Sequence, residues 1–186
     1  IQPLDLEKMH VMVEEACKGL AGVSASQVEI QSGIQFYDGI STAEIQEILI
    51  RSASDLIDLD HPNYQFVAAR LLLFALRKNL YGRVHELPDL KDHVAKCVWK
   101  GIYDSDILDS YTDEEFDKLQ TFIDHDRDYL FTYAGLRQVV DKYLVQDRST
   151  NELYETPQFM YLLIAATIFS KYPKETRLDY VKKYYD

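Results

Sequence analysis

The chain has 186 residues, of which 47% are hydrophobic, with only 7 glycines and 5 prolines, so it can build a core and is not a disordered chain. A formal net charge of −11 disfavours nucleic acid and anionic membranes as main partners, although a few local lysines would still allow a small phosphate ligand. The wide spacing of Cys17 and Cys97 argues against a disulfide framework or a zinc knuckle. With no signal peptide and no membrane-spanning apolar run, we expect a cytoplasmic, mainly helical protein.

Helical spacing of apolar residues dominates the first half of the chain. A capping box of Ser41 and Glu44 begins the third predicted helix, and a turn at Asp38-Gly39 precedes it. The fourth helix ends at Gly82 and is apolar on nearly every face, which predicts that it is central. The predicted helices cover residues 4–20, 24–34, 41–58 and 63–81.

Beyond a linker at 82–88 the predicted helices become shorter. Thr112 and Glu115 form a second capping box, and Pro157 occupies the first position of a strongly apolar helix that Pro173 ends. Leu144/Val145 and Leu153/Tyr154 flank Ser149-Thr150-Asn151, which predicts a β-hairpin. The predicted helices cover residues 89–100, 112–123, 131–141 and 157–172, with one more after Pro173.

If the first helices form an up-and-down bundle, four helix ends meet at one place. Two helix N-termini there would attract an anion, basic side chains would add positive charge, and aromatic and methionine side chains could hold a base. This predicts a nucleoside triphosphate site. The residues alone favour a simpler explanation, in which the basic side chains offset a helix dipole and the threonine is a cap. The residues at this end are Asp5, Lys8, Met9, Phe36, Tyr37, Thr42, Gln46, Arg77 and Lys78.

Five segments in order, covering essentially the whole chain, resemble the N-terminal region of class I ribonucleotide reductase large subunits of the enterobacterial type. They are QVEIQSGIQFYDGISTAEIQEILIRSASDLI, PNYQFVAARLLLFALRKNLYG, TDEEFDKLQTFIDHDRDYLFTYAGLRQ, KYLVQDRSTNELYETPQFMYLLIAATIFS and YPKETRLDYVKKYYD. The resemblance implies a mainly α fold. Residues 1–82 would form an ATP-cone helical bundle without its opening β-hairpin. Residues 83–186 would form a helical region with one short β-hairpin, leading towards a missing ten-stranded α/β barrel.

The resemblance also implies an allosteric site for ATP as activator and dATP as inhibitor, with Mg²⁺ accompanying the nucleotide. Lys8 and Lys78 would face phosphate, Met9 would pack near the base, and Thr42 and Gln46 would complete the site. The family often has His where this chain has Gln46, and commonly Asn where it has Asp5. Its opening hairpin, with a V-x-K-R-x-G type motif, lids the nucleotide. The chain starts just after that motif, and loss of this lid would weaken binding.

The family's catalytic cysteines belong to the barrel, so we expect this piece to be inactive alone. Cys17 and Cys97 are interpreted as buried small hydrophobic residues. The chain begins at Ile1 and stops at Asp186 within a helical pattern, so we expect it to be part of a longer protein. The parent would be a cytoplasmic ribonucleoside-diphosphate reductase making deoxyribonucleotides for DNA synthesis. Its implied partners are a radical-bearing small subunit and further copies of itself, with contacts at His10, Ser26 and Glu29.

Two other hypotheses stay open. The cone could be vestigial and act only as a helical scaffold or subunit-interaction module. Alternatively, the FIDHDRD segment could be a metal or acid–base site, because it gathers Asp124, His125, Asp126 and Asp128. On a helix, however, only Asp124 and Asp128 share a face, and a charged helix end explains the segment equally well. A stand-alone enzyme of this kind would need a pocket and a His with a shifted pKa.

Overall fold

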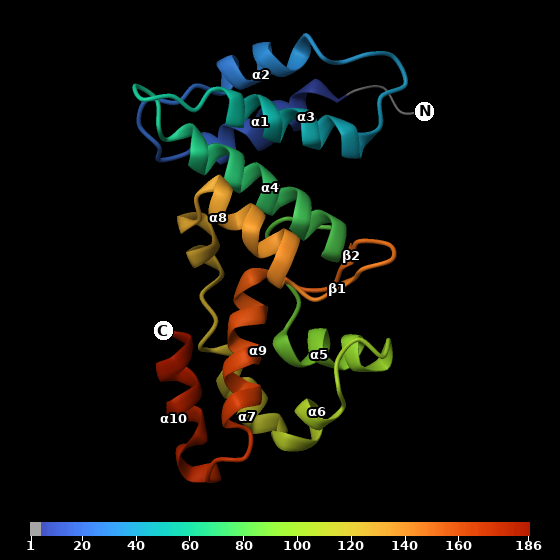
Figure 1. The fold of residues 1–186 in the computed structure, drawn as a ribbon, viewed down its shortest axis with the longest axis vertical. Coiled ribbons are helices and arrows are strands. Elements are labelled where there is room, and N and C mark those ends of the chain that lie inside the picture. The colour runs from blue at the N-terminus through green and yellow to red at the C-terminus, as the bar shows by residue number, and fades with distance from the viewer. Residues whose placement is uncertain (1–4) are drawn as a thin grey trace. The chain divides into compact units, whose positions relative to one another are not determined.

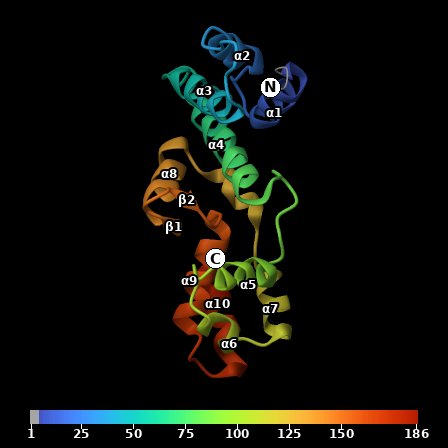
Figure 2. The same cartoon turned by 90° about the vertical axis from the view of Figure 1, so that its right-hand side faces the viewer.

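The computed structural model describes residues 5–186, and the chain divides into two compact units. The first unit comprises Ile1–Lys78 with Tyr129–Val139, and the second comprises Asn79–Asp128 with Val140–Asp186. Figures 1 and 2 show the ribbon in two views, coloured from blue at the N-terminus to red at the C-terminus. Leu4, where the first predicted helix begins, lies outside the described residues.

Helices build the first unit, as predicted. The fourth helix supplies much of its core, since Val67, Leu73 and Phe74 are buried there beside Val13 and Leu49 from earlier helices. It ends at Tyr81, where Gly82 takes a φ of +74° that favours glycine. The elements are α1 (Leu6–Cys17), α2 (Ala25–Gly33), α3 (Thr42–Asp55), α4 (Tyr64–Tyr81), whose last residues belong to the second unit, and α8 (Tyr133–Gln138).

The third helix begins where predicted and ends early. Ser41 Oγ accepts the Glu44 N–H at 3.2 Å, and Ser41 N–H donates to Glu44 Oε2 at 2.9 Å, so the capping box is confirmed. The helix stops at Asp55 instead of Asp58. The Asp58 carboxylate accepts the His61 N–H at 2.6 Å and so stabilises a turn, because a short acidic side chain competes with helical hydrogen bonds.

The second unit is built around α9, which is apolar on nearly all sides. Phe159, Leu162 and Ala165 of α9 are fully buried in its core. Helix α10 lies beside α9 in both views (Figures 1 and 2) and contributes Val181 and Tyr185. The elements are α5 (Leu90–Trp99), α6 (Asp106–Ser110), α7 (Asp113–Gln120), a 3₁₀ helix (His125–Leu130) that continues into the first unit, a π-helical turn (Val139–Tyr143), β1 (Gln146–Asp147), β2 (Glu152–Leu153), α9 (Pro157–Phe169) and α10 (Lys174–Tyr185).

The predicted hairpin is present, with shorter strands. Gln146 pairs with Leu153 and Asp147 with Glu152 in an antiparallel ladder, and the turn contains Asn151 at a φ of 59°. At the next pair in register, the Tyr154 N–H still donates to the Val145 carbonyl at 3.1 Å. The Val145 N–H, however, donates to the carboxylate of Glu155 at 2.9 Å and not across the hairpin.

Two further predictions of helix starts are confirmed, and one predicted helix is divided. The capping box of Thr112 and Glu115 and the N1 position of Pro157 are confirmed. The helix predicted over 131–141 is α8 followed by the π-helical turn, and α6 was not predicted. No helix among residues 5–186 has the length and apolar character needed to cross a membrane.

Candidate functional site

A pocket of about 1010 Å³ lies at one end of the first unit, where the predicted helix ends meet. The beginnings of α1 and α3, the loop after α2 and one side chain near the end of α4 form it. Its volume is at the upper end of the range for small-molecule sites. The pocket includes every residue predicted to contact nucleotide. It is lined by Asp5, Lys8, Met9, Met12, Phe36, Tyr37, Asp38, Gly39, Ile40, Ser41, Thr42, Ile45, Gln46 and Lys78.

Two lysines, Lys8 and Lys78, line the pocket together with two aspartates, Asp5 and Asp38, and the lysines differ in their partners. Lys8 Nζ lies 3.2 Å from Asp5 Oδ2, while Lys78 forms no ion pair within residues 5–186. Asp5 also caps α1, since its Oδ1 accepts the Lys8 N–H at 3.1 Å, and this hydrogen bond lowers the pKa of Asp5. Asp5 therefore stays ionised at neutral pH and offsets part of the Lys8 charge.

The N-terminus of α3 opens onto the same pocket. Thr42 is the first residue of this helix and is exposed, so its hydroxyl is accessible. Glu44 accepts hydrogen bonds from Ser41 and from Tyr37 Oη at 2.9 Å, and the contacts with Ser41 are the main reason why its pKa is lowered. Because the remaining N–H groups of the first turn have no intrahelical partner, this end can accept an anion.

Apolar side chains and one buried amide complete the lining. Met9, Phe36 and Ile45 supply apolar surface suited to a flat ring. Gln46 is only 8% exposed, and its amide makes no hydrogen bond with any described residue. The amide atoms are not among the fully buried unpaired atoms of the described residues, so the amide is open to a ligand that enters the pocket. Ile45 and Met12 were not predicted, although each lies one helical turn after a predicted residue.

Arg77 does not belong to this pocket, which corrects the prediction that it adds charge there. Its side chain is 3% exposed, and its guanidinium carbon lies 5.7 Å from the ring centroid of Tyr129. Arg70 approaches the same ring at 5.5 Å. Successive residues of a helix point about 100° apart, so Lys78 reaches the pocket while Arg77 faces the interior.

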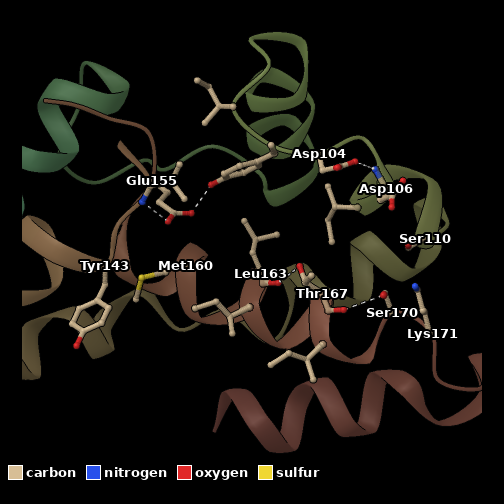
Figure 3. Close-up of a pocket in the computed structure, with 16 residues that line it drawn as sticks. Asp104, Asp106, Ser110, Tyr143, Glu155, Met160, Leu163, Thr167, Ser170 and Lys171 are labelled. Carbon is tan, nitrogen blue, oxygen red and sulfur yellow. Dashed lines mark hydrogen bonds between the residues drawn. The ribbon is translucent and has the colours of Figure 1, made fainter. Parts of the chain in front are cut away.

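A second pocket, of about 690 Å³, lies in the second unit (Figure 3). Met160 and Leu163 of α9 line it together with the buried carboxylate of Glu155. None of the residues predicted to bind nucleotide lines this pocket.

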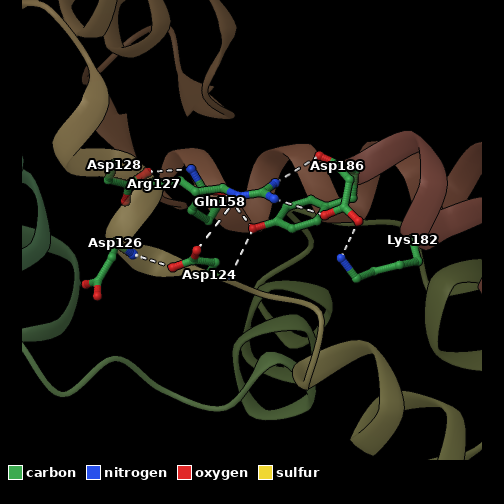
Figure 4. Close-up of polar contacts among 8 residues, drawn as sticks. Asp124, Asp126, Arg127, Asp128, Gln158, Lys182 and Asp186 are labelled. Carbon is green, nitrogen blue, oxygen red and sulfur yellow. Dashed lines mark hydrogen bonds and ion pairs between the residues drawn. The ribbon is translucent and has the colours of Figure 1, made fainter.

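The FIDHDRD segment is linked to α9 and α10 by hydrogen bonds (Figure 4). It lies largely in the 3₁₀ helix, so the α-helical geometry assumed for it is wrong. Asp128 is buried and accepts from Gln158 Nε2 at 2.8 Å, and Gln158 Oε1 accepts from Tyr185 Oη at 2.7 Å. The Asp124 N–H donates to Tyr185 Oη at 3.0 Å, and His125 packs edge-on against Phe159. Across residues 5–186, no three His, Cys, Asp or Glu side chains are placed to hold a metal ion.

The cysteines are both protonated at neutral pH. Burial raises the pKa of the Cys17 thiol to about 11 and also raises that of Cys97. Cys97 is buried as predicted, whereas Cys17 is only half-buried. Neither thiol therefore has the lowered pKa typical of a reactive cysteine.

The residues predicted to contact a partner lie on α1 and α2. His10 Nδ1 and Glu29 Oε1 are 2.7 Å apart and so bind the two helices to each other. Ser26 is exposed. This surface is at least partly engaged within the unit itself.

A helical bundle with an anion-accepting pocket at one end fits a nucleotide-binding regulatory domain, and comparison with known families agrees. Residues 1–79 match the ATP cone domain, and residues 129–186 match the family described as ribonucleotide reductase, all-alpha domain.

Individual relatives extend this likeness over the whole chain. The chain is 55% identical over 183 residues to ribonucleoside-diphosphate reductase 1 subunit alpha of Escherichia coli (strain K12), which covers 98% of this chain and 24% of that protein. It is 54% identical over 185 residues to the corresponding subunit alpha of Haemophilus influenzae, covering 100% of this chain and 24% of that protein. For the subunit alpha of Enterobacteria phage T4 the identity is 39% over 187 residues, with coverages of 100% and 24%.

The chain belongs to the family of class I ribonucleoside-diphosphate reductase alpha subunits, whose N-terminal region it matches. It spans only about a quarter of the length of these curated relatives, 24% in each case. The predicted family and the predominantly helical fold class are thereby confirmed.

Proposed function

We propose that the pocket of the first unit binds ATP and dATP, and that this region sets the overall activity of a ribonucleoside-diphosphate reductase. The observation that carries the proposal is the convergence of two lysines, an open helix N-terminus and the Gln46 amide on one pocket, within the segment that matches the ATP cone. This combination suits a ligand with a polyanionic end and a polar, partly apolar end.

Each side chain has a role in this proposal. Lys78 and Lys8 bind the phosphates, with Lys8 exchanging its contact with Asp5 for a phosphate oxygen. Thr42 and the first N–H groups of α3 hold a further phosphate. Gln46 pairs with the ribose or the base, and Met9 packs against the base. Mg²⁺ accompanies the triphosphate and offsets the charge of the nearby acids.

The parent protein, in the same proposal, reduces ribonucleoside diphosphates to deoxyribonucleotides with cysteines that lie outside this chain. Regulation follows linkage: dATP favours an inactive oligomer, and ATP favours the active form. The partners are a radical-bearing small subunit and further copies of the parent. The surface of His10, Ser26 and Glu29 is the proposed contact.

Calorimetric titration of ATP and of dATP, each with Mg²⁺, into the 186-residue chain tests the site. We expect Lys78→Ala to weaken binding about tenfold to a hundredfold, because a charged hydrogen bond to phosphate is lost. Lys18→Ala is the matched control, since Lys18 is an exposed lysine of the same unit that does not line the pocket. Its affinity should equal that of the wild type.

A folded chain that releases no heat with either nucleotide would contradict the proposal. The cone would then be a scaffold that binds other subunits without sensing nucleotide. Equal losses in Lys78→Ala and Lys18→Ala would move the nucleotide away from this pocket. Circular dichroism of each variant distinguishes lost binding from lost folding.

A further inference from the structure

The pocket of the second unit has an apolar wall that the proposed nucleotide site does not use. Helix α9 contributes Met160, Leu163, Ile164 and Ile168 to the lining, and Ile107 of α6 is also a lining residue. Met160 and Leu163 are labelled in Figure 3. Ile164 and Ile168 are 43% and 50% exposed, which is high for isoleucine. A cavity of about 690 Å³ with such a wall can hold an aliphatic or aromatic body of moderate size.

A buried carboxylate lies at one end of this cavity. Glu155 is 2% exposed and accepts hydrogen bonds from Tyr103 Oη and from the Val145 N–H at 2.9 Å. Both donors are neutral, and Glu155 forms no ion pair with any residue that the structure describes. A carboxylate accepts more than two hydrogen bonds, so it retains capacity towards the cavity.

Two exposed acids lie at the opposite end of the cavity (Figure 3). Asp104 Oδ1 accepts the Asp106 N–H at 3.0 Å, and neither carboxylate is ion-paired within residues 5–186. Lys171 is the one basic side chain among the described lining residues, against the two exposed carboxylates and Glu155, whose pKa is raised by burial. The cavity therefore combines apolar surface with negative charge, which repels nucleotides and carboxylic acids and attracts a cation.

We propose that this cavity is a binding site for hydrophobic amines, with the ammonium group held by Asp104 and Asp106 and the apolar body lying against α9. The ammonium is placed at Asp104 and Asp106 because these carboxylates are exposed and can be reached by a hydrated cation, whereas Glu155 is buried and already accepts two hydrogen bonds. A neutral analogue would gain only the apolar contact, and an anionic analogue would be repelled. The site is separate from the proposed nucleotide pocket and does not depend on it.

Three probes with the same chain length test the proposal: octylammonium, 1-octanol and octanoate. Each is titrated into the 186-residue chain, and binding is followed through the methyl NMR signals of Met160 and Ile164. We expect saturable shifts with octylammonium, and an affinity about fivefold lower for octanol, which corresponds to the loss of weak ion pairs at an exposed rim. Octanoate should bind more weakly still.

The double variant Asp104→Asn/Asp106→Asn separates charge from shape. Asn keeps the turn that Asp104 stabilises, so the variant should fold, and octylammonium should then bind no better than octanol. Asp179→Asn removes an exposed acid of α10 outside the cavity and should leave the preference unchanged. Equal affinity of the three probes for the wild-type chain would overturn the proposal. So would the absence of saturable shifts, or an unchanged preference in the double variant.

Discussion

The two units differ in the charged groups of their pockets although both are helical: two lysines and two aspartates line the first, and three acidic side chains and one lysine line the second. In the first unit, Lys8 and Lys78 meet the open N-terminus of α3, whereas in the second unit carboxylates including Glu155 lie beside the apolar wall of α9. The net charge of −11 for the whole chain does not indicate which charged side chains line either pocket. The chemistry of each pocket depends on which helix ends and side chains the fold brings together, so ligand class has to be inferred from the pocket and not from composition.

The units also differ in how their ion pairs are used. Lys8 and Asp5 in the first unit are exposed, with 86% and 48% of their side-chain surface accessible. Arg177 and Glu115 in the second unit form a bidentate pair with only 4% and 14% accessible. An exposed pair can exchange partners with a ligand at little cost, whereas a buried pair is strongly destabilising to break. The first arrangement suits binding and the second suits structure.

The largest expected effect comes from breaking the buried pair. Arg177→Met should lower the free energy of unfolding by about 3 kcal/mol, because Glu115 is largely shielded from solvent and would keep only its hydrogen bond from the Thr112 N–H. Urea denaturation followed by circular dichroism measures the loss. Lys182→Met is the control, since it breaks the exposed pair of Lys182 and Asp186 and should cost no more than about 1 kcal/mol. Similar losses in both variants would refute the distinction between buried and exposed pairs.

The same pair predicts a pH dependence. The hydrogen bond from Arg177 lowers the pKa of Glu115 below its ordinary value of 4.5. The unfolded state therefore takes up the proton first as pH falls. The stabilisation is complete above pH 4.5 and is lost as pH falls through the lower folded-state pKa. In Arg177→Met this part of the acid sensitivity should disappear.

The next effect uses a motif that both units share. Ser41→Ala and Thr112→Ala each remove the hydroxyl of a capping box and should each cost about 1 kcal/mol of unfolding free energy. Only Ser41 lines the proposed nucleotide pocket, so only Ser41→Ala should also weaken ATP binding in calorimetry. Equal affinities for ATP in the two variants would argue against a role for the N-terminus of α3 in binding.

Local rules predicted much of the first unit. The capping box at Ser41, the turn at Gly39 and the central position of α4 follow from residues close in sequence, and the meeting of helix ends follows from short connections. These local rules were enough to predict that Lys8, Thr42 and the other predicted residues lie at the same end of the unit. Arg77 was misplaced because a one-residue step along α4 decides between the pocket and the interior.

The second unit was harder to predict because distant polar contacts shape it. Asp128 and Gln158 are far apart in sequence, and nothing around either residue indicates the other. The hydrogen bond from the Val145 N–H to the Glu155 carboxylate is likewise not indicated by the alternation of apolar residues in the hairpin. The acidic cavity also escaped prediction, since its walls come from separate segments. Periodicity and capping describe single elements, whereas these features need the tertiary structure.

Histidines in the two units give the smallest effect and the clearest contrast. His10 in the first unit is exposed and bonded to Glu29, and this bond, with the nearby charge of Glu14, raises the pKa of His10 above 6.5. His93 in the second unit stacks on Phe159 at 4.5 Å, and burial lowers its pKa to about 4. The pKa of histidine is thus raised in the first unit and lowered in the second.

An NMR titration of the imidazole signals tests this contrast. Because its folded-state pKa is raised, His10 stabilises the contact between α1 and α2 at low pH, and that contribution is lost as pH rises through the folded-state pKa. Glu29→Gln should move the pKa of His10 down towards 6.5 and leave that of His93 unchanged, because Glu29 and His93 belong to different units. Glu14→Gln should lower the pKa of His10 by less, since Glu14 acts at 3.3 Å and through its charge alone. If Glu29→Gln left His10 unchanged, the bond between α1 and α2 would be absent in solution, and His10 would be available to a partner subunit.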